Sequence, residues 1–351
     1  MRNYFFCLLL LFGCKKDDTN DSSSHPNLYG EGVYIVTDEA INYYNDITGD
    51  LQENIFMSAN GTRINNPKKI VLEDQNAFIV GNRLYVVDID NFHLKGEVSG
   101  FNNLTDCNII SFNRALASDQ GESKVKVVDL DRYEIETDIE TGDSTKPSFI
   151  ISNWNRAFVL NGGGVPKIKK DTTVVIIDHK NDAGLPLSDF AGKTIIGDNP
   201  NSAIIRGSEL IVLCKGVYNI NFPSSNSIAS FYKISRNSGS INDIILLPGV
   251  YNANSLVAST NNEELYFTAI DGVYKCLLPS MSYSLFLNRQ SSILSVNNEK
   301  YNTTDSTHVY TDMIYMNDTQ RPGYIFKYNT FLNTYTDSFT VVGNILDISA
   351  K

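Results

Sequence analysis

The chain has 351 residues, 42% of them hydrophobic and 20% charged, so it can bury a core and is not a disordered tail. Its 29 lysines and arginines against 40 aspartates and glutamates give a formal net charge of −11. The basic surface that binds a nucleic-acid backbone is therefore missing, and we expect no nucleic-acid partner.

The first fourteen residues have the pattern of an export signal. Arg2 precedes an apolar run from Tyr4 to Phe12, and small Gly13 precedes Cys14. This run is about half the length of a membrane-spanning helix, which needs about 20 apolar residues. We interpret residues 1–13 as a signal peptide that is absent from the mature protein.

The residues around Cys14 predict a lipid anchor. Leu11-Phe12-Gly13-Cys14 resembles a bacterial lipobox, in which the cysteine is acylated and becomes the new N-terminus. Cys14-Lys15-Lys16-Asp17-Asp18 resembles the acidic signal that sends lipoproteins of the Bacteroidota to the outer face of the outer membrane. These resemblances imply a protein that faces the cell exterior and touches the membrane only through its lipid. An ordinary secretory signal with a chance cysteine is the alternative.

Residues 14–30 are expected to be the lipidated cysteine and a flexible tether. From Thr19 to Gly30 the chain is rich in Asn, Asp, Ser, Pro and Gly and has almost no aliphatic side chains. A flexible linker of 16 residues, from Lys15 to Gly30, reaches roughly 20 to 24 Å.

Beyond the tether, short apolar runs rich in β-branched and aromatic residues alternate with polar turn clusters, which indicates strands. One run recurs seven times, on average 47 residues apart: INYYN ending at Asn45, LYVVD at Asp88, VKVVD at Asp129, VVIID at Asp178, ASFYK at Lys233, DGVYK at Lys275 and GYIFK at Lys327. This period is typical of one four-stranded propeller blade. We therefore predict an all-β fold in which residues 31–351 form a seven-bladed β-propeller of antiparallel blades.

The two ends of this domain predict how the ring closes. Asn344 to Ile348 resembles the first strand of a blade with nothing after it, whereas Gly32 to Asp38 begins at a second strand. Pairing of the C-terminal strand with the N-terminal blade would complete that blade and remove an open sheet edge. A β-sandwich or an eight-stranded barrel is the alternative, but neither requires seven evenly spaced copies.

Three sets of motifs resemble a known group of proteins. They are Pro200-Asn201-Ser202 with LIVLCKG at 210–216, LYF at 265–267 with GVYK at 272–275, and YYNDITG at 43–49. The chain resembles Bacteroidota surface lipoproteins with a YncE-like, YVTN-type seven-bladed propeller. The resemblance implies a non-catalytic capture or accessory protein, often beside a TonB-dependent outer-membrane transporter. One relative captures cobalamin on its propeller face.

Motifs for catalysis and metal binding are missing from the sequence. The four histidines are scattered, no metal-ligand spacing occurs, and Gly162-Gly163-Gly164 lacks the GK[ST] ending of a phosphate loop. Asp88-Ile89-Asp90-Asn91 and Asp129-Leu130-Asp131 are interpreted as turns. Cys214 and Cys276 lie in apolar runs and are expected to be buried strand residues. We expect no catalytic residues, no metal and no cofactor.

Loop lengths suggest where binding surface has been added. The loops between second and third strands share one propeller face, and three are long: Asn161 to Thr172, Lys215 to Ser227 and Met313 to Gly323. They combine aromatic, amide and charged groups, which suit a polar ring-containing ligand or a partner protein. The candidate ligand-binding residues on this face are Asp119, Lys215, Tyr218, Asn219, Tyr315 and Arg321.

The leading hypothesis is a lipid-anchored surface propeller that binds a small molecule, such as a corrinoid, siderophore or glycan, or docks on a TonB-dependent transporter. A scaffold or adhesion propeller without a small ligand is one alternative. A metal-dependent lactonase or lyase, whose inward Asp, Glu and Asn side chains hold a divalent cation, is the other.

Overall fold

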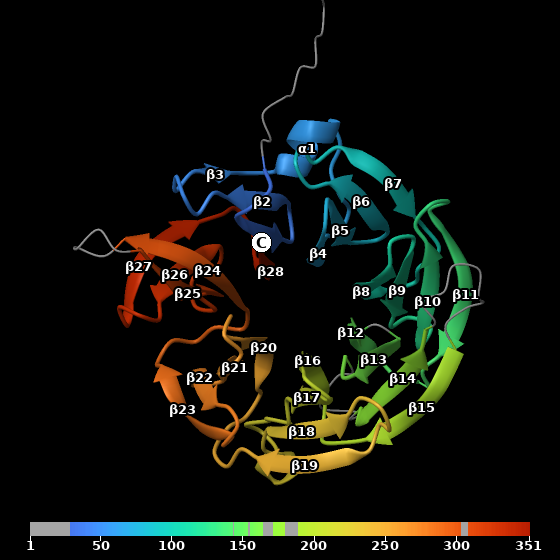
Figure 1. Cartoon of the computed structure of the whole chain (residues 1–351), viewed down its shortest axis with the longest axis vertical. Coiled ribbons are helices and arrows are strands. Elements are labelled where there is room, and N and C mark those ends of the chain that lie inside the picture. Colours follow the sequence, from blue (N-terminus) through green and yellow to red (C-terminus); the bar gives the residue numbers. More distant parts are fainter. Residues whose placement is uncertain (1–28, 143, 154, 164–170, 180–188, 303–307) are drawn as a thin grey trace, which may run out of the picture.

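The computed structural model describes residues 29–351 except 143, 154, 164–170, 180–188 and 303–307. In these residues, seven four-stranded antiparallel sheets stand side by side in a ring (Figure 1). The first strand of each blade, A, faces the ring centre, and B, C and D follow outward. The prediction of an all-β seven-bladed propeller is confirmed.

The strands of the blades are as follows, in the order A to D. Blade 1 has β28 (Ile345–Ala350), β1 (Val33–Thr37), β2 (Ile41–Tyr44) and β3 (Leu51–Gln52). Blade 2 has β4 (Lys69–Glu73), β5 (Asn76–Val80), β6 (Leu84–Asp88) and β7 (Leu94–Val98). Blade 3 has β8 (Leu104–Ser111), β9 (Arg114–Asp119), β10 (Lys124–Asp129) and β11 (Glu134–Glu140). Blade 4 has β12 (Pro147–Asn153), β13 (Arg156–Asn161), β14 (Thr173–Asp178) and β15 (Asp189–Ile195).

The remaining blades follow the same order. Blade 5 has β16 (Pro200–Arg206), β17 (Glu209–Cys214), β18 (Ser230–Ser235) and β19 (Ile241–Leu246). Blade 6 has β20 (Asn254–Ala258), β21 (Glu264–Ala269), β22 (Gly272–Leu277) and β23 (Ser282–Leu287). Blade 7 has β24 (Leu294–Asn302), β25 (His308–Asn317), β26 (Tyr324–Asn329) and β27 (Thr334–Thr340). The helix α1 (Ile55–Asn60) follows β3 at the outer edge of the ring, and the short 3-10 helix η1 (Pro223–Ser225) lies between β17 and β18.

Each copy of the recurring apolar run is the C strand of a blade, from β2 to β26. The B and C strands are buried on both faces because each blade packs between two others, as in β1, where every residue is buried. This explains why they read as continuous apolar runs rather than as an alternation. The outer strands are mostly exposed, as in β27.

The ring closes as predicted, through pairing of β28 with β1. Val33 lies opposite Ala350 and Ile35 opposite Ile348. The N–H of Lys351 donates to the carbonyl of Gly32 at 3.0 Å. Ile35 and Ile348 pack with Tyr315 of blade 7 in one buried cluster, so the C-terminal strand joins the first blade to the last.

Side chains of the inner strands connect the blades around the central channel. At five junctions a carboxylate or hydroxyl of one A strand accepts a hydrogen bond from a backbone N–H of the next. Ile70 N donates to Asp347 at 3.0 Å, and Ile150 N donates to Asp106 at 2.8 Å. These bonds satisfy backbone groups that no strand of the same blade can pair, and they set the spacing of neighbouring blades.

Two propeller faces follow from the strand order. We call the face with the A-to-B and C-to-D turns the AB face, and the face with the B-to-C loops and the blade-to-blade connections the BC face. Since β28 ends and β1 begins at the same end of blade 1, Gly32 and Lys351 both lie at the AB face. Residues 29–31 lie at the same face, where the N–H of Tyr29 donates to the carbonyl of Asp90 in the turn after β6.

One predicted loop is partly wrong. Residues 313–317, expected in a long B-to-C loop, belong to β25, and the loop is confined to residues 318–323. The extra length of blade 7 lies instead in the A-to-B hairpin, where β24 has 9 residues and β25 has 10, against 5 and 6 in β20 and β21. The other two loops do follow B strands, at 162–172, of which 164–170 lie outside the described residues, and at 215–227.

Smaller expectations are also settled by the structure. Cys107, Cys214 and Cys276 are free and buried. Asp88 and Asp129 are turn residues: the Asp129 carboxylate accepts the N–H groups of Asp131 and Arg132, each at 2.8 Å. In the part of the chain that the structure describes, no helix has both the length and the apolar character that crossing a bilayer requires.

Candidate functional site

The six predicted ligand-binding residues lie in blades 3, 5 and 7. Three of them share one loop of blade 5, but the structure does not bring all six together in one site. None of the six lines either of the two cavities described below. The predicted lipidation site, Cys14, and the signal and tether as far as residue 28 lie outside the described residues.

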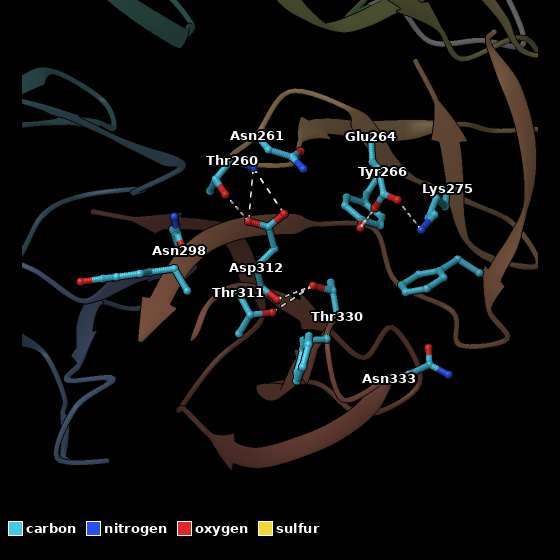
Figure 2. A pocket seen from close by; sticks show the side chains of 13 residues that line it. Thr260, Asn261, Glu264, Tyr266, Lys275, Asn298, Thr311, Asp312, Thr330 and Asn333 are labelled. Carbon is cyan, nitrogen blue, oxygen red and sulfur yellow. Dashed lines mark hydrogen bonds and ion pairs between the residues drawn. The ribbon is translucent and has the colours of Figure 1, made fainter. Parts of the chain in front are cut away.

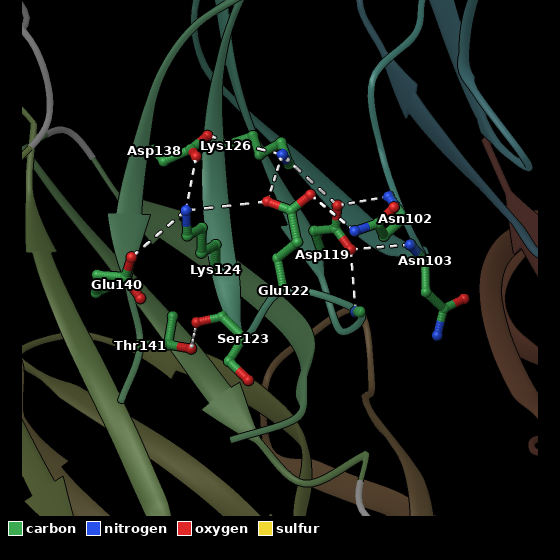
Figure 3. Close-up of polar contacts among 11 residues, drawn as sticks. Asn102, Asn103, Asp119, Glu122, Ser123, Lys124, Lys126, Asp138, Glu140 and Thr141 are labelled. Carbon is green, nitrogen blue, oxygen red and sulfur yellow. Dashed lines mark hydrogen bonds and ion pairs between the residues drawn. The ribbon is translucent and has the colours of Figure 1, made fainter. Parts of the chain in front are cut away.

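Asp119 is a fully buried turn residue at the end of β9. Its carboxylate accepts the backbone N–H groups of Asn102 and Asn103, both at 2.8 Å, and of Gly121 at 3.0 Å (Figure 3). The side chain therefore links the connection between blades 2 and 3 to the β9–β10 turn through hydrogen bonds. This position leaves it without a surface to offer a ligand.

The charged groups around Asp119 are paired with one another (Figure 3). Lys126 lies 2.9 Å from Glu122 and 3.8 Å from Asp119, and Lys124 lies 3.0 Å from Asp138. The hydrogen bond to Asp138 and the negative charge of its carboxylate raise the pKa of Lys124, because they outweigh the small opposing effect of burial. This cluster is a network of ion pairs on the outer part of blade 3.

Blade 5 places Lys215, Tyr218 and Asn219 in the loop after β17, on the BC face. Lys215 is half-buried, and burial lowers the pKa of its ammonium. The Tyr218 ring is half exposed and lies 5.6 Å from the Tyr251 ring. Asn219 is buried and shapes the loop, because its Oδ1 accepts the N–H of Asn221 at 3.0 Å.

In blade 7 one of the two predicted residues is buried in a strand and the other lies at the BC face. Tyr315 was expected in a loop, but it is buried in β25 and its hydroxyl donates to Glu299. Burial and the nearby Glu299 carboxylate raise the pKa of Tyr315. Arg321 is at the BC face: it donates to Asp318 at 2.8 Å and its guanidinium lies 4.0 Å from the centre of the Tyr324 ring.

A cleft lies on the opposite, AB face, between blades 6 and 7 (Figure 2). This cleft has a volume of about 570 Å³. Such a volume is within the range of roughly 300–1,000 Å³ that small-molecule sites occupy. The residues that line it are Thr260, Asn261, Glu264, Tyr266, Lys275, Phe286, Asn298, Tyr310, Thr311, Asp312, Thr330, Phe331 and Asn333.

The long hairpin of blade 7 forms one wall of this cleft. Asn298 and Asp312 are opposite each other in β24 and β25, about midway along the hairpin. The four residues that β24 has beyond β20 correspond to about 13 Å of extra strand at about 3.3 Å per residue. The C-to-D turn with Thr330 and Phe331 packs against this wall, since Thr330 N donates to the Asp312 carbonyl at 3.1 Å.

Blade 6 supplies the other wall, and hydrogen bonds tie it to blade 7. The carboxylate of Asp312 accepts the backbone N–H of Thr260 at 3.2 Å and also its hydroxyl. Deeper in the cleft, Lys275 Nζ lies 2.5 Å from Glu264, and the Tyr266 hydroxyl donates to the same carboxylate (Figure 2). These contacts hold the polar groups of the cleft in place before any ligand arrives.

The protonation state of the cleft follows from this pairing. Burial raises the pKa of Glu264, but hydrogen bonds from Lys275 and Tyr266 outweigh it, so the pKa is lower than usual. Burial and the Glu264 carboxylate raise the pKa of Tyr266. Near neutral pH, Glu264 is therefore an anion held by a cation and a neutral phenol.

A second cavity, of about 320 Å³, lies among the inner strands of blades 1 to 4. At its edge Lys69 Nζ lies 2.7 Å from Asp106 and 4.9 Å from the centre of the Phe149 ring. Burial lowers the pKa of Lys69, but Asp106 and Asp347 outweigh it and raise the pKa. An ammonium group thus neutralises the inward carboxylates here. Across the described residues, no group of three His, Cys, Asp or Glu side chains is arranged to hold a metal ion.

Sequence reasoning missed the cleft although a signal for it was present. The sixth and seventh copies of the repeat, ending at Lys275 and Lys327, are 52 residues apart, above the mean of 47. The excess predicts a longer B-to-C loop, but it lengthens the A-to-B hairpin, which builds the cleft on the other face.

No known protein family and no curated protein matches the chain. Among solved structures, apo AztD from Citrobacter koseri is 12% identical, with 92% of this chain and 98% of AztD covered and a TM-score of 0.55. A quinonprotein alcohol dehydrogenase-like protein from Bacteroides thetaiotaomicron is 12% identical, with coverages of 91% and 75% and a TM-score of 0.55. At such low identities the similarity concerns the fold alone, and the chain is an all-β seven-bladed propeller.

Proposed function

We propose that this chain is a lipid-anchored cell-surface propeller that captures a small polar molecule and passes it, chemically unchanged, to a TonB-dependent outer-membrane transporter. The observation that carries the capture is the cleft between blades 6 and 7. The anchor rests on the lipobox-like sequence Leu11-Phe12-Gly13-Cys14 and on the sorting signal after it.

The cleft has the properties of a binding site. It combines aromatic rings with amide, hydroxyl and charged groups, which is the mixture that fixes a small ligand in one orientation. Its carboxylates are held by hydrogen bonds from Lys275, Tyr266 and Thr260. Carboxylates held by such hydrogen bonds are suited to binding a ligand in a fixed orientation rather than to transferring protons.

The B-to-C loop of blade 5 supports docking on a protein. Ile220 and Phe222 are 75% and 66% exposed at its tip, and Tyr218 lies beside them in the sequence. Exposed apolar and aromatic side chains that lie close together are typical of protein contact surfaces. This loop is on the BC face, so a transporter bound there would leave the cleft on the AB face free.

Lipidation is tested by growing cells with labelled palmitate. We expect label in the wild-type chain and none in a Cys14→Ser variant, which should also leave the membrane fraction. Label in the variant, or soluble wild-type protein, would remove the anchor from the proposal.

Capture is tested by thermal unfolding of the mature chain with a panel of cyanocobalamin, ferric siderophores and oligosaccharides. A rise in the unfolding temperature with one of them supports the proposal. Docking is tested by purifying the solubilised wild-type protein with any bound transporter, which an Ile220→Ser, Phe222→Ser variant should lose. The proposal is refuted if no compound shifts the unfolding temperature and no transporter co-purifies with the wild type.

A further inference from the structure

We infer that the cleft between blades 6 and 7 recognises a neutral saccharide, whose sugar rings pack against Tyr310 and Phe331. The inference names the ligand class of the site in the proposed function and rests on that function. It follows from three features of the cleft: exposed aromatic rings, amide and hydroxyl groups, and its charge.

Two of the aromatic rings that line the cleft are exposed to solvent. Tyr310 is 68% exposed and Phe331 59% exposed, whereas Tyr266, deeper in the cleft, is buried. Exposed aromatic rings that line a hollow offer a ligand a flat apolar surface to pack against. A pyranose suits them, because its C–H groups carry partial positive charge and the face of an aromatic ring carries partial negative charge.

The polar groups of the cleft match hydroxyls. In the described part of the chain, the Asn298 amide has no hydrogen-bond partner, although it lines the hollow. Asn333 uses its Oδ1 to accept from Tyr328 at 2.6 Å, which leaves its NH2 group to donate. Amides offer donors and acceptors side by side, and a sugar hydroxyl both donates and accepts, so each amide can bind one or two hydroxyls.

The charge of the cleft favours a neutral ligand. Lys275 is the only Lys or Arg among the described residues that line the cleft. Its Nζ lies 2.5 Å from the Glu264 carboxylate, which already neutralises it. Asp312 adds a negative charge, and the whole chain carries −11. An acidic sugar would lose hydration without meeting a free cation, which disfavours uronic-acid and sulfated glycans.

The test is binding of the full mature chain to an array of neutral oligosaccharides (glucans, mannans, xylans and galactans) with acidic oligosaccharides and cyanocobalamin beside them. Affinity for the best neutral oligosaccharide is then measured by calorimetry at low and high salt. We expect neutral oligosaccharides to bind, with an affinity that changes less than about twofold with salt, since no ion pair forms.

Variants locate the site. Tyr310→Ala and Phe331→Ala should each weaken binding by about tenfold or more without lowering the unfolding temperature, because both rings are exposed. The matched control is Phe112→Ala, an exposed phenylalanine in the A-to-B turn of blade 3, which should bind like the wild type.

Each outcome bears on the inference. Binding of cyanocobalamin or acidic glycans only, or of no neutral oligosaccharide, overturns the saccharide class, and the proposed capture function then stands or falls on the other compounds. Neutral oligosaccharides that bind both cleft variants as tightly as the wild type overturn the assignment to this cleft.

Discussion

Removal of the Asp119 carboxylate should destabilise the propeller, although sequence reasoning placed this residue in a binding site. The carboxylate is fully buried and accepts three backbone N–H groups, from Asn102, Asn103 and Gly121. Asp119→Ala leaves all three donors without their partner. The ring would then lose the contact that fixes the blade 2–3 connection to the β9–β10 turn.

The size of the effect follows from these bonds. A hydrogen bond to a charged group contributes about 1.5–3 kcal/mol net. Because the residues Asn102 and Asn103 are exposed, water can replace part of their bonds, so we expect a loss of about 2–4 kcal/mol rather than the full sum. Asp119→Asn keeps the oxygen shared by Asn103 and Gly121 and should lose about half as much.

Thermal unfolding followed by circular dichroism measures the loss. At roughly 2 °C per kcal/mol for a domain of this size, Asp119→Ala should lower Tm by about 4–8 °C. The control is Asp131→Ala, an exposed aspartate in the β10–β11 turn at the other end of blade 3, which should change stability by less than about 0.5 kcal/mol. An Asp119→Ala protein with the wild-type Tm and no ligand binding would refute the structural role and restore the binding one.

Three further predictions concern closure, pH and the thiols. Ile348→Ala, which truncates a buried residue of β28 against Ile35, should cost about 2–4 kcal/mol in thermal unfolding, whereas Leu346→Ala, at the exposed bulge of the same strand, should cost under about 1 kcal/mol; equal losses would contradict the closure. Burial raises the pKa of Asp347 to about 6 from 3.8, so its stabilising contribution is complete below pH 3.8 and is lost as pH rises through 6. Between pH 5 and 7.5 the free energy of unfolding of the wild type should therefore fall by at most about 1.4 kcal/mol relative to that of Asp347→Asn. A difference in unfolding free energy between the two proteins that is constant with pH would show that the pKa of the carboxyl is not shifted. Burial raises the pKa of Cys214 to about 12 and of Cys276 to about 11, so a thiol reagent should label the folded protein at neither residue and label both after denaturation; rapid labelling before unfolding would disprove their burial.

The structure confirms the predicted fold but does not gather the six predicted binding residues in one place, and individual residues show why. Asp119 and Asn219 have the side chains of binding residues, but such side chains also cap turns, and the two roles look alike in a sequence. Tyr315 has an aromatic ring suited to a ligand, but it points into the core because β25 continues through it. Lys215 and Tyr218 in blade 5 and Arg321 in blade 7 do lie at the predicted face, but in two separate blades.

The strands, the number of blades and the closure of the ring could be read from the chain alone. Each depends on local patterns: apolar runs that recur at one spacing, turn residues between them, and an unpaired first strand at the C-terminus. The place of the cleft depended on tertiary structure. A long segment such as 294–317 becomes a wall only if its two halves pair and rise beside a shorter neighbour, as β24 and β25 do beside β20 and β21. Hairpin pairing and blade contact join residues distant in sequence, so the hollow between Glu264 and Asp312 exists only in the folded ring.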